Sequence, residues 1–554
     1  MARLEGIGVG QGVAHGPVAR MAPAPEAPAE DQSTLTAEQE TARVEEAVAA
    51  VAEDLKARGE AAGGSARDVL QAQAMMAKDP TLKKAATARL EKGLTGEFAV
   101  HDAFAEFRAT LEGMGGYMAE RAADLADVSQ RVIARLRGLP APGVPAPGRP
   151  FVLVAEDLAP ADTALLDMDQ VLAVVTVQGG PTSHTAILAR EKAITAVVGA
   201  VEADQLRDGE TVIVDAADSA VLTEVTDEQL DDAQRRIDER AAAVAAPVTP
   251  GALADGTEVP LLANLGSPDG AAEAVELGAE GVGLFRTEFL FLSADEAPDV
   301  ATQRESYRRL LEAFAGRKVV VRALDAGADK PLPFLTEEEE NPALGRRGLR
   351  ALLAHEQILR DQLTALAEAE AETEADVWVM APMVSTVAEA EQFVAIAHEH
   401  GLRTAGVMVE VPSSALVAEP ILRHADFASI GTNDLTQYTM AADRLLGSVA
   451  DLQDPWHPAV LRLVGEVGSA GAATDSPVGV CGEAAADPLL AVVLVGLGAT
   501  SLSMAPAALA DVRLELGRRT RETAVAAARA ALVAEDAAGA RAAAHQVARE
   551  AAQG

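Results

Sequence analysis

Residues 171–190 have the sequence VLAVVTVQGGPTSHTAILAR, which places a strand directly before a helix. The first seven residues are mostly apolar and rich in β-branched side chains, as is typical of a strand. The Ala-, Ile- and Leu-rich residues at the end of the stretch favour a helix. Gly179 and Gly180 let the backbone turn sharply between the two. A strand that turns straight into a helix is the building unit of an α/β domain, so this stretch predicts that fold class.

His184 lies at the switch from strand to helix. Thr182 and Ser183 can cap the helix, whose first backbone amides are then available to bind an anion. A neutral imidazole in this place can attack phosphorus, and the positive end of the helix would stabilise the resulting phosphohistidine. A structural histidine is equally compatible with the local sequence. A metal site is less so, because no second His or Cys lies within ligand spacing.

Length and composition limit the fold and the partners. A chain of 554 residues should contain several domains. Its net charge of −39 argues against nucleic acid or an anionic membrane as a partner, since both would be repelled. The absence of a long uncharged apolar stretch predicts a cytoplasmic protein without membrane spans. Cys481 is the only cysteine, so an intrachain disulfide is impossible.

The first half of the chain predicts an α/β domain that is interrupted by a helical insertion. Residues 1–20 favour short strands and turns. Their glycines do not form a dinucleotide loop, because a Pro- and Ala-rich linker follows them instead of a long helix. Residues 34–139 carry apolar side chains at three- and four-residue spacing, which predicts about four helices. We therefore predict an α/β domain at 1–25 and 145–224, an inserted helical subdomain at 26–144, and a linker helix with a hinge at 225–250.

The second half predicts a (β/α)8 barrel at residues 251–554. Short apolar segments alternate with helical stretches over roughly 300 residues, as such a barrel requires. The expected strands are 260–264, 281–285, 318–322, 377–381, 406–410, 427–431, 478–481 and 501–504. The active site of a barrel lies where its strands end, so the polar residues at those ends are the candidates for function.

Basic residues at the strand ends predict a site for a small anion. Arg286 and Arg322 follow the second and third strands, and Lys330 and Arg444 lie further along the chain. Guanidinium groups match carboxylate and phosphate oxygens in a bidentate way, so the set suits an anion that carries both groups. Each arginine alone is equally compatible with a packing role, but their coincidence at successive strand ends favours function.

Two carboxylates and a thiol follow the next strands. Glu410 and Asp434 end the fifth and sixth strands, and Asn433 stands beside Asp434. The two carboxylates could share Mg²⁺, which prefers oxygen ligands and often uses one or two protein carboxylates. Cys481 follows the seventh strand, where a thiol could give a proton to a carbanion carbon. An inert buried thiol is the alternative.

These motifs resemble those of a known group of enzymes. Residues 179–184, with AVVG at 196–199, resemble the phosphohistidine segment of the phosphoenolpyruvate-utilising enzymes. Pro181 stands where many relatives have Arg, so a phosphate contact from that side chain is missing. The barrel motifs are similar to those of the Enzyme I family of the phosphoenolpyruvate:sugar phosphotransferase system: GLFRTEFL at 283–290, RALD at 322–325, MVEVP at 408–412, SIGTNDLTQY at 429–438 and VCGE at 480–483.

The resemblance implies a phosphotransferase with a phosphohistidine intermediate. In that family a phosphoryl group passes from phosphoenolpyruvate to a histidine, here His184, and then to a histidine of a small phosphocarrier protein, HPr. Pyruvate is the other product. The remaining roles implied are substrate binding by Arg286, Arg322, Lys330, Asn433 and Arg444, Mg²⁺ binding by Glu410 and Asp434, and protonation of the enolate by Cys481.

The resemblance also implies partners for the two halves of the chain. The carrier is expected to dock on the helical subdomain, where RAAD at 121–124 matches the family. Met75 and Met76 could belong to that surface, but they are equally typical of a helix core. The barrels of the family pair, so a homodimer is expected.

Two alternatives remain open. A phosphoenolpyruvate synthase or a pyruvate phosphate dikinase would share the histidine segment and the barrel, but it needs a nucleotide-binding domain of a few hundred residues before them. This chain has only the helical insertion there. A non-catalytic regulatory relative would keep the fold and bind partners. Against it, all the candidate residues of the site are present, and such a relative should have lost at least one.

Overall fold

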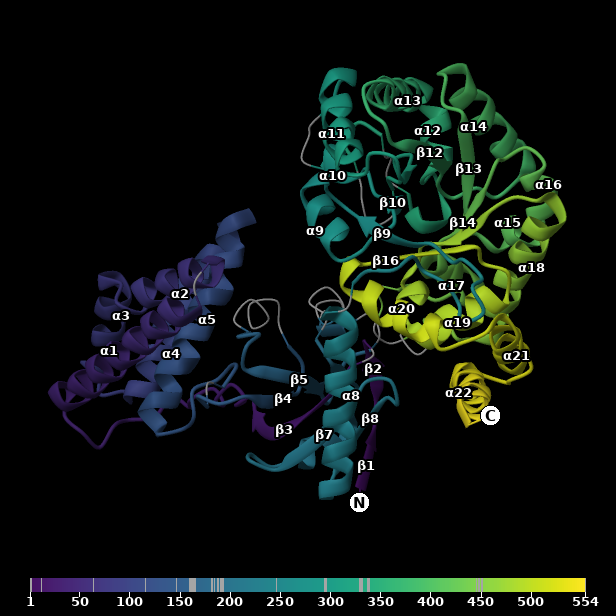
Figure 1. Ribbon diagram of the computed structural model, residues 1–554. Coiled ribbons are helices and arrows are strands. Elements are labelled where there is room, and N and C mark those ends of the chain that lie inside the picture. Colours follow the sequence, from purple (N-terminus) through teal and green to yellow (C-terminus); the bar gives the residue numbers. More distant parts are fainter. Residues whose placement is uncertain are drawn as a thin grey trace. The chain divides into compact units, whose positions relative to one another are not determined.

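The computed structural model describes most of the chain (Figure 1). The described residues are 2–10, 12–62, 64–114, 116–145, 147–158, 166–180, 183, 185–186, 189, 194–245, 247–292, 296–327, 332–335, 339–444, 446, 449 and 452–553. Two compact units make up the chain. The first, here the N-terminal unit, comprises Met1–Gly8, Val13–Gly179 and Thr195–Ala233. The second, here the barrel unit, comprises Val9–Gly12, Gly180–Ile194 and Gln234–Gly554.

A mixed sheet of eight strands forms the α/β part of the N-terminal unit. Its strands lie in the order β1-β8-β7-β3-β4-β5-β6-β2. The pairs β3–β4, β4–β5 and β5–β6 are parallel, while β3–β7, β7–β8 and β1–β8 are antiparallel. The strand predicted in the first seven residues of 171–190 is confirmed as β5. The strands are β1 (Ala2–Glu5), β2 (Ile7–Val9), β3 (Val13–Arg20), β4 (Phe151–Ala155), β5 (Val171–Thr176), β6 (Ala196–Val198), β7 (Thr211–Asp215) and β8 (Ala220–Thr223).

The insertion predicted between β3 and β4 is helical. The described residues form five helices, where the sequence predicted about four, and two of the five follow Gly93. Asp79 caps one helix by accepting hydrogen bonds from the backbone N–H groups of Thr81 and Leu82, with Pro80 at the first helical position. The helices are α1 (Ala37–Ala62), α2 (Gly64–Ala77), α3 (Pro80–Leu90), α4 (Gly96–Met114) and α5 (Gly116–Arg137).

A single helix, α8 (Asp227–Ala245), follows the α/β part, as the sequence predicted. Its second half, from Gln234, belongs to the barrel unit. There the guanidinium of Arg240 donates two hydrogen bonds of 2.7 Å each to the carboxylate of Asp511. This bidentate pair ties the end of α8 to the barrel unit.

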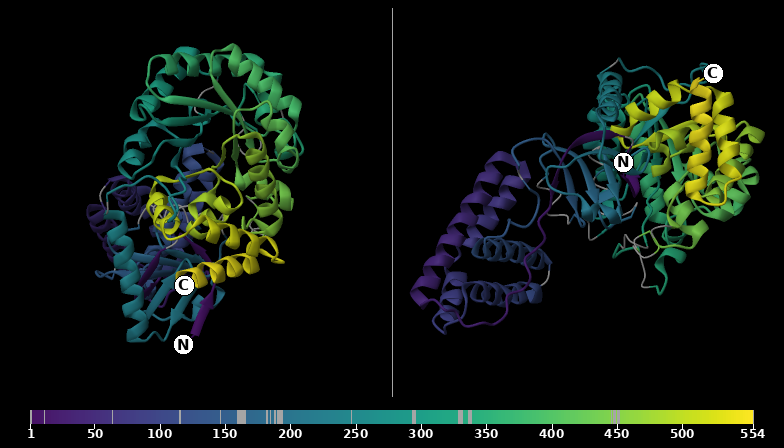
Figure 2. Two further views of the ribbon diagram at one scale, coloured as in Figure 1. Left: turned by 45° about the vertical axis from the view of Figure 1, so that its right-hand side comes forward. Right: turned by 90° about the horizontal axis from the view of Figure 1, so that it is seen from below.

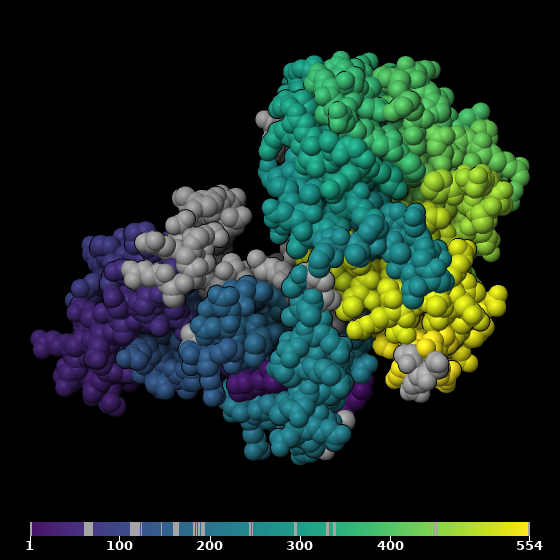
Figure 3. Space-filling model, in the orientation of Figure 1, coloured from purple at the N-terminus to yellow at the C-terminus, as the bar shows by residue number. Residues whose placement is uncertain are grey.

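The barrel unit contains a closed barrel of eight parallel strands, and all eight predicted strands are confirmed. Two further views show its helices around the outside of the strands (Figure 2), and their side chains form a continuous surface in the space-filling view (Figure 3). The fold class predicted from the sequence is therefore correct. The strands are β9 (Leu261–Leu265), β10 (Val282–Phe285), β11 (Lys318–Arg322), β12 (Asp376–Ala381), β13 (Thr404–Val409), β14 (Ala428–Ile430), β15 (Val478–Val480) and β16 (Ser501–Met504).

The helices of the barrel unit connect these strands and extend the chain beyond them. They are α9 (Ala271–Glu276), α10 (Phe289–Leu292), α11 (Val300–Ala313), α12 (Leu349–Ala354), α13 (Glu356–Ala371), α14 (Val387–Glu399), α15 (Pro412–Leu416), α16 (Ala418–Leu422), α17 (Thr432–Met440), α18 (Pro458–Thr474), α19 (Pro488–Gly496), α20 (Leu509–Gly517), α21 (Arg521–Leu532) and α22 (Ala537–Gln553). Within the part of the chain that the structure describes, none of the helices is long and apolar enough to cross a membrane.

Candidate functional site

The carboxyl ends of the barrel strands bring most of the predicted residues to one rim. Arg286 follows β10, Arg322 ends β11 and Glu410 follows β13. Asp434 lies in the first turn of α17, directly after β14, and Cys481 follows β15. Because all eight strands of the closed barrel run parallel, these ends meet on the same side. We call this group of residues the barrel rim.

Glu410 is the most deeply buried carboxylate of the rim, with 1% of its surface exposed. One of its oxygens, Oε1, accepts a hydrogen bond of 2.7 Å from the backbone N–H of Met383. Met383 has a φ of 56°, which is unusual for a residue with a side chain, and strain of this kind is common at functional sites. Burial, together with the negative charges of Asp434 and Asp325, raises the pKa of Glu410 to about 8.

Arg322 is a buried cation among carboxylates. It forms ion pairs with Glu288 and with Asp325, the latter at 3.3 Å. Burial opposes its charge, but the surrounding carboxylates, including Glu410 and Asp434, raise the pKa of Arg322 above its ordinary value. Its Nε is buried and has no hydrogen-bond partner among the described residues. One face of the guanidinium therefore keeps its capacity to bind an anion.

Arg347 is a second buried arginine at the rim, and the sequence did not predict it as a site residue. Its guanidinium donates hydrogen bonds to Asp325 Oδ2 (2.9 Å), Asp434 Oδ1 (3.0 Å) and the hydroxyl of Tyr438 (3.1 Å). It lies in the long connection between β11 and α12, far from any strand end. The rule that selects residues at strand ends cannot find such a residue. The only local signal is the pair Arg346-Arg347 just before a helix.

Two of the predicted residues, Asn433 and Asp434, lie at the start of α17, and a third, Arg444, follows its end. The guanidinium of Arg444 lies 3.6 Å from Asp434 Oδ2, so both oxygens of Asp434 face arginines. Asn433 accepts a hydrogen bond of 3.0 Å from the backbone N–H of Glu483 and donates one of 3.3 Å to its side chain. These two bonds join the loop after β14 to the loop after β15 and fix the neighbouring position of Asp434.

Cys481 is buried, and its surroundings keep it protonated. Burial is the main cause that raises the pKa of the Cys481 thiol to about 11, while a hydrogen bond from Ser429 and the charges of Arg322 and Arg286 act in the opposite direction. The thiol faces the backbone oxygen of Ile430 at 3.5 Å. At neutral pH the group is therefore a thiol and can act as an acid.

Asn264 positions the segment that carries Cys481. Its side-chain amide donates hydrogen bonds to the backbone oxygens of Cys481 (2.8 Å) and Ser503 (3.2 Å). Asn264 lies within β9. Its two hydrogen bonds therefore join the first strand of the barrel to the last strand, β16, and to the residue that follows β15. The sequence pointed to this residue as a strand end, but it gave no role for it.

Two predicted residues lie outside the described residues. His184 and Lys330 both belong to this group, as does Pro181. Next to His184, the hydroxyl of Ser183 accepts a hydrogen bond of 3.2 Å from the backbone N–H of Ala186. This is the bond that a helix cap makes three residues ahead, as the sequence predicted for Ser183.

The rim offers hard oxygen ligands to a cation. Among the residues that the structure describes, no group of three or more His, Cys, Asp or Glu side chains is arranged to hold a metal ion. Two carboxylates, Glu410 and Asp434, are close enough for the charge of one to raise the pKa of the other. A divalent cation would relieve this repulsion, and Mg²⁺ commonly binds through only one or two carboxylates. The donor set therefore fits Mg²⁺.

Comparison with known proteins agrees with this rim. Three family models match: the PEP-utilising enzyme, N-terminal domain at 5–121, its mobile domain at 147–219 and its PEP-binding domain at 240–521. A phosphoenolpyruvate-protein phosphotransferase of Streptomyces coelicolor is 54% identical over 546 residues, which cover 96% of this chain and 97% of that protein. The chain belongs to the phosphoenolpyruvate-protein phosphotransferase family.

Other members of this family are more distant but match over similar lengths. The phosphoenolpyruvate-protein phosphotransferase of Haloferax volcanii is 41% identical and covers 85% of this chain and 86% of its own length. That of Bacillus subtilis is 36% identical and covers 95% of this chain and 96% of its own length. The family assigned from the sequence motifs is thus confirmed. The PEP-binding domain of the family spans the closed barrel and its rim.

Proposed function

We propose that this enzyme transfers the phosphoryl group of phosphoenolpyruvate first to its own His184 and then to a histidine of a small phosphocarrier protein, with release of pyruvate. The observation that carries the proposal is the barrel rim. Buried arginines, a pair of carboxylates and a protonated thiol converge there in a chain of the phosphoenolpyruvate-protein phosphotransferase family. A trianionic substrate, a cation and a proton donor are the three things that this reaction requires.

The arginines would bind the substrate. Arg286 and Arg444 are more exposed than Arg322, so they are accessible to phosphate and carboxylate oxygens at the mouth. Arg322 would add a buried positive charge to the same rim. Lys330 and Asn433 complete the proposed set. Guanidinium groups suit this task because each can bind two oxygens of one anionic group.

Glu410 and Asp434 would hold Mg²⁺. Burial and mutual repulsion disfavour two ionised carboxylates at this place, which a cation would reverse. When bound, Mg²⁺ would stabilise the negative charge that develops on the enolate oxygen of the substrate.

Cys481 would act as the acid. When the imidazole of His184 attacks phosphorus, the bond between phosphorus and the enol oxygen breaks and its electrons stay on the enolate. The methylene carbon of the enolate then takes the proton of the Cys481 thiol and becomes the methyl group of pyruvate. A raised pKa suits this role, because the thiol keeps its proton until the carbanion develops.

The same proposal gives a role to each of the other parts of the chain. The α/β domain at 1–25 and 145–224 would carry the phosphohistidine, and the helix with a hinge at 225–250 would let it visit both the barrel at 251–554 and the carrier. The carrier would dock on the helical subdomain at 26–144. There Met75 is 70% exposed, whereas Met76 packs against the helical core. Pairing of two barrels as a homodimer and a cytoplasmic location complete the proposal.

Phosphoenolpyruvate with radioactive phosphorus, together with Mg²⁺, tests the proposal. We expect an acid-labile label on the protein that maps to His184 and disappears in His184→Ala. A protein that never becomes labelled would instead support a non-catalytic relative. Turnover of ATP or AMP by the purified protein would favour the phosphoenolpyruvate synthase or dikinase alternative.

A further inference from the structure

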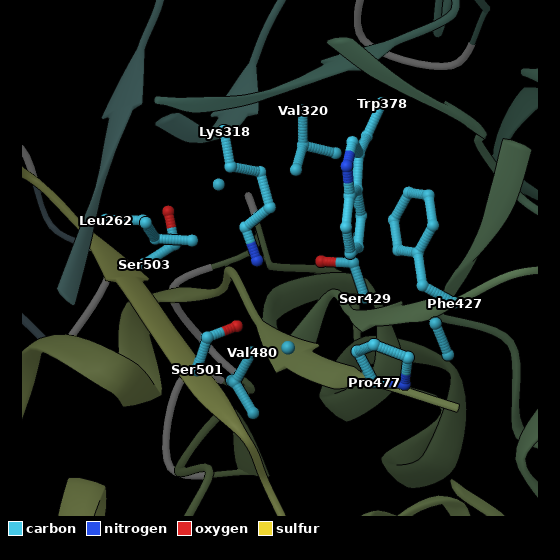
Figure 4. Close-up of a pocket in the computed structure, with 13 residues that line it drawn as sticks. Leu262, Lys318, Val320, Trp378, Phe427, Ser429, Pro477, Val480, Ser501 and Ser503 are labelled. Atoms are coloured by element: carbon cyan, nitrogen blue, oxygen red, sulfur yellow. The ribbon is translucent and has the colours of Figure 1, made fainter. Parts of the chain in front are cut away.

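A small polar pocket lies at the end of the barrel opposite the rim. Its cavity volume is about 20 Å³, enough for one water molecule. Lys318 begins β11 and Ser501 begins β16, so the pocket is at the amino ends of the strands. The polar side chains that line it are those of Lys318, Ser429, Ser501 and Ser503, and the aromatic rings of Trp378 and Phe427 close one side (Figure 4). We call it the floor pocket.

Lys318 places an amine in this pocket. Figure 4 shows its side chain extending into the space between the serines of β14 and β16. The Nζ atom lies 4.6 Å from the centre of the Trp378 ring. Burial lowers the pKa of Lys318, and the charge of Asp376 only partly opposes this effect. Lys318 and Trp378 are both half-buried, so the pocket connects to solvent on this side.

Ser429 joins the floor pocket to the rim. Its side chain lines the pocket. Ser429 pairs with Gly479 in the register of β14 and β15, so its side chain and that of Cys481, two residues after Gly479, point to the same face of the barrel wall. Cys481 itself packs on the apolar side chains in the barrel interior, including Met408 and Phe427. The pocket therefore reaches the thiol from below, whereas the substrate is expected to reach it from the rim.

Gly479 keeps a space open between two of the hydroxyls. A Cβ atom at this position would lie 3.1 Å from Ser501 Oγ and 3.9 Å from Ser429 Oγ. Both hydroxyls therefore border the volume that a methyl group would fill. A cavity of about 20 Å³ with several polar neighbours suits a single water molecule, because pockets for metabolites are many times larger.

We propose that the floor pocket is a proton path, in which Lys318, water and Ser429 return a proton to Cys481 after each reaction. The inference rests on the proposed function of Cys481 as the acid. After the thiol has given its proton to carbon, the Ser429 hydroxyl donates its proton to the thiolate and takes one from water in the pocket. That water takes a proton from the Lys318 ammonium, and Lys318 regains one from solvent. The net change is one proton moved from solvent to sulfur.

The path has a physical reason. Substrate and product fill the rim during the reaction, so they exclude water from the upper side of the thiol. The Cys481 side chain packs in an apolar cluster of the barrel with Leu284, Met380 and Met408. Ser429 offers a hydroxyl on the same face of the barrel wall, towards the pocket. A route through the floor lets the thiol exchange its proton while the rim is occupied.

An isotope experiment in D₂O tests the proposal with the full-length protein, Mg²⁺, phosphoenolpyruvate and pyruvate. Carbon label that passes from pyruvate into phosphoenolpyruvate measures how often the two interconvert. Deuterium in the methyl group of pyruvate measures how often Cys481 exchanges its proton with solvent. The wild-type enzyme should incorporate about one deuteron for each interconversion, because exchange through the pocket is fast.

Three variants interrupt the path in different ways. Lys318→Met removes the donor, Ser429→Ala removes the hydroxyl beside the thiol, and Gly479→Ala fills the space without removing a polar group. In each variant, Cys481 should take a proton from pyruvate and return the same proton to the enolate without exchange with solvent. The deuterium incorporated per interconversion should therefore fall about threefold or more. The ratio does not depend on the amount of folded enzyme, because both labels are measured in the same sample.

Two matched controls change residues that do not line the pocket. Ser476→Ala removes a half-buried hydroxyl that hydrogen-bonds to the hydroxyl and the backbone oxygen of Thr474. Gly465→Ala adds a methyl group that would meet Leu497 at an ordinary 3.5 Å. Both should keep the wild-type ratio. A wild-type ratio in all three path variants would overturn the proton path while leaving the proposed function intact. A wild-type enzyme that shows no interconversion at all would instead contradict the proposed function.

Discussion

Loss of Arg347 should weaken the barrel unit, because this buried guanidinium joins two carboxylates. It donates hydrogen bonds to Asp325 and Asp434 at 2.9 and 3.0 Å, and only 3% of it is exposed. Removing one partner of a buried ion pair costs about 3–5 kcal/mol, since the other charge stays buried without compensation. Arg322 still pairs with Asp325, and Arg444 still faces Asp434. We therefore expect Arg347→Met to cost about 3 kcal/mol, the lower end of that range.

Denaturant unfolding followed by tryptophan fluorescence measures this effect. Both tryptophans of the chain, Trp378 and Trp456, lie in the barrel unit, so the signal reports on that unit. The matched control is Arg346→Met, which alters the exposed neighbour and should change stability by less than about 0.5 kcal/mol. Adding Asp325→Asn to Arg347→Met should recover part of the loss, because without Arg347 the buried Asp325 carboxylate keeps only one of its two arginine partners. If Arg347→Met unfolds at the same denaturant concentration as Arg346→Met, the buried network does not stabilise the barrel as argued.

Three further predictions concern the chemistry of the rim. Cys481→Ala should slow pyruvate formation by at least about a hundredfold and change the affinity for phosphoenolpyruvate little. Rapid-quench kinetics measure the first effect and equilibrium binding the second. An unchanged turnover rate would show that the thiol is not the acid. Iodoacetamide should modify Cys481 slowly at pH 8 and faster as the pH rises towards 11, because the raised pKa of the thiol keeps the thiolate scarce below pH 11. Mass spectrometry of this single cysteine gives the rate. A rate that rises with an inflection near pH 8.5, the ordinary pKa of a thiol, would contradict the argument that burial raises the pKa. Glu410→Gln should raise the Mg²⁺ concentration needed for half-maximal labelling of the protein more than tenfold, and a chelator should abolish labelling in the wild type; an unaltered Mg²⁺ dependence would exclude Glu410 as a ligand.

The helices and strands were largely predictable because their signals are local. Each barrel strand is a short apolar run between helical stretches, and such a pattern does not depend on distant residues. Where the strands end follows equally from the sequence. A closed parallel barrel turns those ends into one rim, so Arg322, Glu410 and Cys481 could be expected together before any coordinates were known. The glycines that divide the helical insertion were less informative, because a helix can continue through a glycine or end at it.

The sequence by itself determined the two architectures of this protein and the chemical types gathered at the barrel rim. Only the tertiary structure decided which charges pair and which groups are buried. Arg347 enters the rim from a long loop, and Asn264 bonds to backbone atoms more than two hundred positions away, so no local pattern predicts either contact. The raised pKa of Glu410 has the same origin. Electrostatic coupling depends on distance and burial in the folded chain, and sequence spacing encodes neither.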